Sequence, residues 1–205
     1  KLREISKRLN QYVEEEKGTA TDYLRNLREN RLLIKESLGR NGYQSYIDLI
    51  LKAGTDRGRF IQELLQNADD CDYLPDEIPT FSMYQKGNSV FTEYNEVGFN
   101  RANIRSITAI GESTKNKLFN GQIAAIGEKG VGFKAVFSVA SEVRIHSGEY
   151  HFSLTYREPT IPRPLTAPQD NFAGTRMEVI LKDQNTFPAY KEKEILELCL
   201  CLRKL

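Results

Sequence analysis

Residues 60–70 read FIQELLQNADD, a stretch in which polar residues recur as regularly as apolar ones. Its apolar residues recur three and four positions apart, which predicts a helix with one buried face. A second stripe at positions i, i+4 and i+7 runs beside that face and consists of Glu63, Asn67 and Asp70. An acid, an amide and an acid in line fit either a solvated helix surface or a binding surface.

The bulk composition is that of an ordinary globular chain. The 205 residues are 40% hydrophobic and 28% charged, and the formal net charge is +1. No apolar run approaches the roughly 18 residues of a membrane span. The near-neutral charge gives no overall attraction to nucleic acid or to an anionic membrane. We therefore expect neither a membrane nor a nucleic-acid partner.

The cysteines and histidines give no sign of a disulfide framework or a zinc site. Cys71, Cys199 and Cys201 are odd in number, which favours reduced thiols in an intracellular protein, cytoplasmic or nuclear. His146 and His151 lie in an alternating stretch and read as strand residues. The chain begins without a Met, which indicates a fragment of a longer protein.

Hydrophobic periodicity predicts an α+β fold with a mixed, mostly antiparallel sheet covered by helices on one face. We expect a helical extension over 1–52, a main domain over 53–185, and a closing helix over 186–205 that leads to a remainder of the polypeptide. The proline-rich stretch 158–169 reads as structureless. The expected strands cover 80–87, 89–96, 142–148, 150–157 and 175–182.

The sequence GEKGVGFK at 127–134 allows three interpretations. A P-loop fails because Phe133 stands where the motif requires lysine. A dinucleotide-binding fingerprint matches Gly130, Gly132 and Ala135, but neither the opening strand nor the alternating helices of that fold accompany it.

The third interpretation is an anion site, in which glycines let backbone N–H groups approach a phosphate at a helix N-terminus. Lys129 and Lys134 would add positive charge, and the following residues supply a short helix. A flexible surface turn is the plainer alternative, but three glycines in six residues directly before a helix favour the anion site.

The stretches ELLQNADD, YNEVGF, IGEKGVGFKAVF and GTRMEVILK together resemble, in this order, four motifs of the GHKL ATPase superfamily. These motifs are the N-box, the first and second glycine boxes and a late Gly-Thr strand. With IGESTK between the glycine boxes, the likeness is closest to the branch of sacsin and the plant NO VEIN proteins. The resemblance covers 55–182 and implies a Bergerat fold, a two-layer α/β sandwich that holds ATP between its helices and a lid.

The resemblance also implies roles for the polar stripe. Glu63 would be the general base, Asn67 would coordinate Mg²⁺, and Asp70 would support the adenine or ribose side. The family's adenine-accepting Asp is absent, and Tyr94 or Asn95 falls at or beside its position; the Asn95 carbonyl is preferred as a hydrogen-bond acceptor. The other nucleotide-contacting residues implied are Gly98, Ser113, Thr114, Lys115, Gly127, Lys129, Gly130, Val131, Gly132, Phe133 and Thr175.

The leading functional prediction is therefore a domain that binds Mg-ATP and hydrolyses it slowly. An ordered ATP lid would switch the association of a larger, chaperone-like protein. Expected partners are ATP and further domains of the same polypeptide, and a homodimer is left open. The alternative is a degenerate nucleotide-binding scaffold for protein–protein contact without turnover. A nicotinamide-dependent oxidoreductase rests only on Gly130 and Gly132.

Overall fold

The computed structural model describes residues 18–52, 59–109, 132–170, 172–183, 197, 199–200 and 202–205. The described elements combine helices and strands in an α+β arrangement, as predicted. In chain order they are α2 (Ala20–Lys52), α3 (Arg59–Asp69), β1 (Phe81–Lys86), β2 (Ser89–Tyr94), α4 (Arg101–Thr108), the 3₁₀ helix η1 (Lys134–Ser138), β3 (Ala140–Ser147), β4 (Tyr150–Thr155), β5 (Glu158–Pro164) and β6 (Thr175–Leu181).

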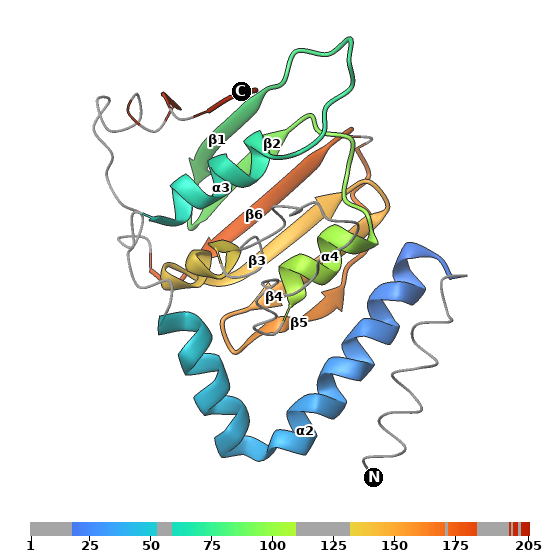
Figure 1. Ribbon diagram of the computed structural model, residues 1–205, viewed down its shortest axis with the longest axis vertical. Coiled ribbons are helices and arrows are strands. Elements are labelled where there is room, and N and C mark those ends of the chain that lie inside the picture. The colour runs from blue at the N-terminus through green and yellow to red at the C-terminus, as the bar shows by residue number, and fades with distance from the viewer. Residues whose placement is uncertain are drawn as a thin grey trace, which may run out of the picture.

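The strands form one six-stranded sheet in the order β1-β2-β6-β3-β4-β5. Every described pairing is antiparallel, so the expected mixed sheet is corrected to an antiparallel one. Figure 1 shows α3, α4 and η1 lying across the same face of this sheet. On β6, Met177, Val179 and Leu181 turn to the covered face and are buried, whereas Glu178 and Ile180 between them are half-buried on the other face. This alternation is what a sheet with one covered face requires.

Strand β5 was not expected, because the prolines of 158–169 were interpreted as breaking any strand. The structure pairs β5 with β4 alone, at the end of the sheet order. Proline has no N–H to donate, but an edge strand needs hydrogen bonds along one side only. Prolines are therefore compatible with a strand at this position, and Ile161 within it is completely buried.

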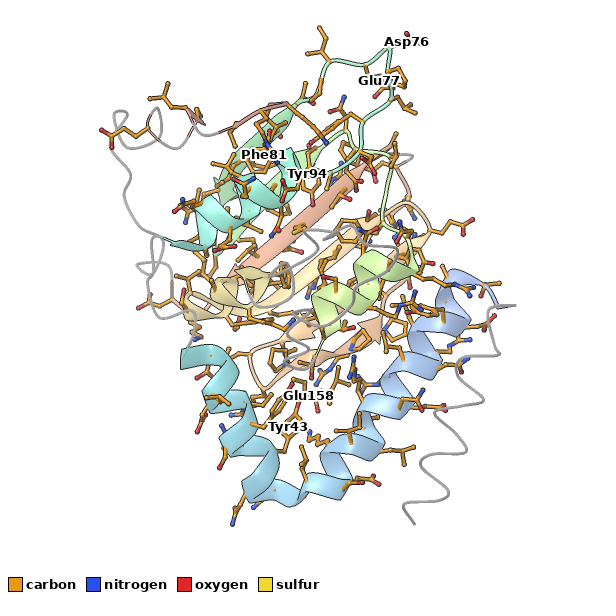
Figure 2. The ribbon with its side chains drawn as sticks, viewed as in Figure 1. Tyr43, Asp76, Glu77, Phe81, Tyr94 and Glu158 are labelled. Atoms are coloured by element: carbon orange, nitrogen blue, oxygen red, sulfur yellow. The ribbon has the colours of Figure 1, made fainter. Side chains whose placement is uncertain are left out.

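Helix α2 runs along the β5 edge and bends sharply at Gly39 (Figure 1). Gly39 has φ 67° and ψ 171°, a non-helical conformation that favours glycine, so α2 consists of two helices that meet at this residue. After the bend, Tyr43 and Ile47 pack with Ile161 of β5. Figure 2 shows Tyr43 beside Glu158, whose carboxylate accepts a 2.7 Å hydrogen bond from Lys35 Nζ. These contacts cover the sheet edge that would otherwise be open.

The first arm of α2 joins the main core. Tyr23, Leu24 and Leu27 are buried in the same cluster as the sheet residues Val143 and Phe152. The described part of the predicted helical extension is therefore packed into the main domain. None of the helices in the described ranges is both long and apolar enough to span a membrane. The predicted closing helix falls largely outside the described residues, and 202–205 are not helical.

Candidate functional site

Helix α3 separates its apolar and polar stripes as the sequence predicts. Ile61, Leu64 and Ala68 are buried against the sheet and η1. Glu63 and Asn67 are half-buried along the neighbouring line. Residues on one line of a helix rise about 1.5 Å per position, so Glu63 and Asp70 stand about 10 Å apart along the axis. This is a suitable length for an elongated ligand with different chemical groups at its two ends.

At one end of this line, the Glu63 carboxylate lies directly against Gly132. An ideal Cβ built on Gly132 would stand 2.9 Å from Glu63 Cδ and closer still to Oε2. Only a residue without a side chain allows this approach. The N-box stretch and the second glycine-rich stretch, remote in sequence, therefore meet at Glu63 and Gly132. Phe133 follows in the core, 2% exposed, with its ring edge-on to Phe137.

Lys134, the next residue, turns into the core instead of toward solvent. It is 2% exposed, and its Nζ donates a hydrogen bond to the carbonyl of Ile107 at the end of α4. Burial, with a smaller contribution from Arg31, lowers the pKa of Lys134 to about 7. Lys134 thus ties η1 to α4 and does not provide the exposed positive charge that the sequence predicted for it.

At the other end of α3, the two adjacent aspartates have different environments. Asp70 Oδ1 accepts hydrogen bonds from Arg203 Nη2 at 2.8 Å and from Gln66 Nε2 at 3.3 Å. Asp69 is completely buried, and its Oδ1 accepts three backbone N–H bonds from residues 203–205, of 2.9, 2.7 and 3.2 Å. The end of α3 is therefore attached to the last described residues of the chain.

Beyond this end of α3, a cluster of buried polar groups was not foreseen from the sequence. Glu96, Ser147 and Thr175 are 5%, 1% and 0% exposed. Thr175 Oγ1 donates to Glu96 Oε1, Ser147 Oγ lies 3.3 Å from the same oxygen, and the two hydroxyls bond to each other. The backbone connects this cluster to α3, since Val97 N–H donates to the Asp72 carbonyl at 2.9 Å. Thr175, which was predicted as a site residue, thus lies against a carboxylate.

The Asn95 side chain hydrogen-bonds to the loop before β1 and not to the buried polar cluster. Its Oδ1 accepts from the backbone N–H of Thr80 at 2.8 Å and from the Thr80 hydroxyl at 3.0 Å. Its Nδ2 donates to Glu77 Oε2 at 3.3 Å and to the Ile78 carbonyl at 3.0 Å. Figure 2 shows Glu77 on the long loop before β1, so the Asn95 amide holds this loop. Glu96, one residue later, is the acceptor that lies beside Thr175. The spacing Glu-x-Gly of Glu96 and Gly98 was the signal available in the sequence.

Gly98 and the residues around it fix where Glu96 sits. Gly98 has φ 92°, and a Cβ there would meet the backbone of Gly148 at 3.3 Å. The 96–99 segment therefore lies against the turn between β3 and β4. Before it, the rings of Phe81 and Tyr94 stack with centroids 6.1 Å apart. Figure 2 labels these two residues next to each other. Burial is the main cause that raises the pKa of Tyr94 well above its ordinary value.

Part of the predicted site lies outside the described residues. The structure brings Glu63 to Gly132 and brings Thr175 to the segment of Gly98, and it turns Asn95 away. The predicted residues without a structural description are Ser113, Thr114, Lys115, Gly127, Lys129, Gly130 and Val131.

The described ranges contain no group of three or more His, Cys, Asp or Glu side chains that could hold a metal ion by themselves. His146 and His151 face each other across β3 and β4, with Nδ1 atoms 3.3 Å apart. Burial lowers the pKa of both rings, so they are neutral at pH 7. Cys71 and Cys199 form no disulfide. The strand assignment of both histidines is confirmed.

With this geometry in view, comparison with known proteins identifies the family. The Sacsin domain family matches residues 40–198, which contain α3, the sheet and every described site residue. The chain belongs to the Sacsin domain family. Protein NO VEIN of Arabidopsis thaliana is 40% identical over 102 residues, which are 50% of this chain. The predicted likeness to the sacsin and NO VEIN branch is confirmed. The aligned part is 4% of the length of that relative, so the chain spans only a small part of it.

Proposed function

We propose that this Sacsin domain binds ATP with Mg²⁺ in a GHKL-type site and hydrolyses it slowly. The observation that carries the proposal is the contact of Glu63 with Gly132, which joins the N-box helix to the glycine-rich stretch. A carboxylate beside a side-chain-free backbone position suits a terminal phosphate with its attacking water. The remaining Bergerat features, the lid above all, are proposed from the resemblance.

The polar line of α3 would be the wall along which the nucleotide lies. Glu63, at the phosphate end, would accept a proton from the attacking water. Asn67, one turn further, would offer its amide oxygen to Mg²⁺, an ion that prefers oxygen ligands and often takes only one or two from the protein. The bound ion would neutralise charge that develops on the phosphates. Asp70 would support the ribose side, where it now pairs with Arg203.

Glu96 replaces Asn95 as the proposed acceptor for the exocyclic amine of adenine. The Asn95 amide already holds the loop before β1, as its four hydrogen bonds show. Glu96 instead lies with Thr175 in the buried cluster. A carboxylate there accepts from adenine and opposes guanine, whose equivalent atom is a carbonyl oxygen. The phosphate contacts proposed for Ser113, Thr114, Lys115, Gly127, Lys129, Gly130 and Val131 follow from the resemblance alone.

In the longer protein, bound ATP would order the lid and thereby change how this domain associates with further domains or with a second copy. Such switching by γ-phosphate contacts is general among nucleotide-dependent proteins. Cys71 and Cys199 form no disulfide, which is consistent with the proposed intracellular location. The scaffold alternative retains the nucleotide site but lacks turnover.

Calorimetry and phosphate release with Mg-ATP test the proposal on wild type, Glu63→Gln and Glu142→Gln. Glu142 is a half-buried carboxylate of β3 that pairs with Arg144 and serves as the matched control. We expect ATP binding by all three proteins and turnover by wild type and Glu142→Gln only, with at least a hundredfold loss in Glu63→Gln. Binding with equal background turnover in all three would favour the scaffold. Absence of ATP binding by wild type would refute the proposal.

A further inference from the structure

We propose that Ser147, which no motif singled out, is a positioning residue that aims the Glu96 carboxylate and so sets the preference for adenine over guanine. This inference rests on the proposed nucleotide function and goes beyond it, because it assigns base selectivity to a hydroxyl on β3. Ser147 is the last residue of β3 and is 1% exposed. It faces the covered side of the sheet, as do Val143 and Ile145.

Three groups meet at this hydroxyl, and their chemistry limits the direction of the hydrogen bonds. The Phe99 N–H can only donate, and it lies 2.7 Å from Ser147 Oγ, which must therefore accept. The Glu96 carboxylate can only accept, and Thr175 Oγ1 donates to it. Thr175 Oγ1 lies closer to Glu96 Oε1 than Ser147 Oγ does, so the arrangement that uses the shorter contacts has Thr175 donating to Glu96 and accepting from Ser147.

The result is a directed chain from Phe99 N–H through the Ser147 and Thr175 hydroxyls to Glu96 Oε1. Each hydroxyl in it donates once and accepts once, and such chains strengthen their members because each bond polarises the next. Ser147 Oγ also lies 3.3 Å from Oε1, so both hydroxyls approach the same carboxylate oxygen. Because both hydroxyls contact the same oxygen, they fix the rotation of the Glu96 carboxylate about the Cγ–Cδ bond.

The segment that carries Glu96 is held at two places beside Ser147. The Phe99 hydrogen bond attaches the end of the segment to β3, and Gly98 lies against Gly148. Loss of the Ser147 hydroxyl would remove the acceptor of Phe99 N–H and the donor to Thr175 together. The carboxylate would then lose its fixed orientation while its charge stayed in place.

Orientation matters more for base selectivity than for nucleotide affinity in general. A carboxylate held in one orientation accepts a hydrogen bond from the adenine amine and repels the carbonyl oxygen of guanine. A carboxylate that rotates makes the hydrogen bond to adenine weaker and the repulsion of guanine weaker. Phosphate contacts at the other end of α3 do not depend on Ser147. The effect of a substitution should therefore appear in the ratio of the ATP and GTP dissociation constants.

The test measures both dissociation constants by calorimetry for wild type, Ser147→Ala, Ser147→Thr and Ser153→Ala. Ser153 of β4 is 2% exposed and is the matched buried serine. For Ser147→Ala we expect ATP binding to weaken about tenfold, the value of one charge-assisted hydrogen bond, with little change for GTP. Ser147→Thr keeps the hydroxyl and should retain the wild-type ratio, as should Ser153→Ala.

A purely structural role would lower the melting temperature of Ser147→Ala and leave the ratio unchanged, and that result would overturn the inference. Should the alanine variant not fold, Ser147→Cys retains the shape with a much weaker hydrogen-bonding group, and the same loss of ratio is expected. Failure of wild type to bind ATP would instead overturn the proposed function itself, so the two failures are distinguishable.

Discussion

The carboxylate of Glu63 occupies the space that a side chain on Gly132 would need. An ideal Cβ at Gly132 would come within 2.9 Å of Glu63 Cδ, well inside normal contact. Two stretches almost seventy positions apart are thereby held together through a glutamate tip and a glycine. The obstructing atoms belong to the flexible end of a side chain, so the protein can tolerate a methyl group only by moving the carboxylate.

Gly132→Ala should therefore impair activity far more than stability. We expect a loss of ATP turnover of at least about tenfold, because the proposed base is displaced, and a change in unfolding free energy below about 1.5 kcal/mol. Phosphate release and urea denaturation measure the two effects. Gly42→Ala is the matched control, since its Cβ would meet Leu38 at an ordinary 3.5 Å. Equal ATP turnover by Gly132→Ala and Gly42→Ala would show that the position of the Glu63 carboxylate does not matter for hydrolysis.

Glu96 and Asn95 should respond oppositely to substitution. Glu96→Gln removes a full acceptor from the buried cluster, and we expect ATP affinity to fall tenfold or more. Asn95→Ala removes hydrogen bonds to Thr80 and Ile78 and should cost about 1 kcal/mol of stability with ATP affinity unchanged. Calorimetry and thermal unfolding of both variants check this. Loss of ATP affinity in Asn95→Ala with unchanged affinity in Glu96→Gln would show that Asn95, and not Glu96, accepts the hydrogen bond from adenine.

Lys134 should make stability rise with pH. Burial lowers its pKa in the folded protein to about 7, against an ordinary value of 10.5 in the unfolded chain. Between these values the unfolded chain binds the extra proton, so the free energy of unfolding increases by up to about 1.4 kcal/mol per pH unit. Above about pH 10, buried tyrosines lower the free energy of unfolding as pH rises and so oppose this trend. Burial raises the pKa of Tyr43 to about 12 and also raises the pKa of Tyr94.

Urea unfolding of wild type and Lys134→Met between pH 7 and 9.5 tests this dependence. The variant should lack the slope, whereas Lys86→Met, at an exposed lysine of β1, should keep it. Parallel curves for wild type and Lys134→Met would show that Lys134 stays protonated in the fold.

Asp69 should anchor the last described residues. Burial acts to raise its pKa, but the three backbone N–H bonds from residues 203–205, with Arg203 nearby, outweigh this and lower it. Its stabilisation is therefore present above about pH 4 and is lost as pH falls through the lowered pKa. Asp69→Asn should cost about 2 kcal/mol at pH 7 and less at pH 3.

Amide exchange locates the effect of Asp69→Asn, since exchange at 203–205 should accelerate. Asp76→Asn, on the exposed loop labelled in Figure 2, should change neither stability nor exchange. Unchanged protection at 203–205 in Asp69→Asn would contradict the anchor.

Local patterns predicted most of the elements well. The stripe of Ile61, Leu64 and Ala68 gave helix α3 within two residues at either end, and Gly87 gave the β1–β2 turn, where its φ is 59°. Strand β5 was missed, because whether prolines break a strand depends on its place in the sheet. The sheet order is not contained in the local sequence.

From residue spacing alone, the candidate site was predictable only where one element carries it. Glu63 and Asn67 share a helix face, so spacing alone aligned them. Glu96 was missed because the hydroxyls that identify it, Ser147 and Thr175, come from 51 and 79 residues further along the chain. Such long-range polar contacts appear only once the fold brings the strands together.

The most direct test of a shared nucleotide site is a crystal structure of this domain with magnesium and a non-hydrolysable ATP analogue. We predict a single shared site, with the adenine amine within hydrogen-bonding distance of Glu96, the γ-phosphate beside Glu63 and Gly132, and the nucleotide extended along α3. A nucleotide bound elsewhere, or with its base remote from Glu96 and its phosphates remote from Gly132, would contradict it.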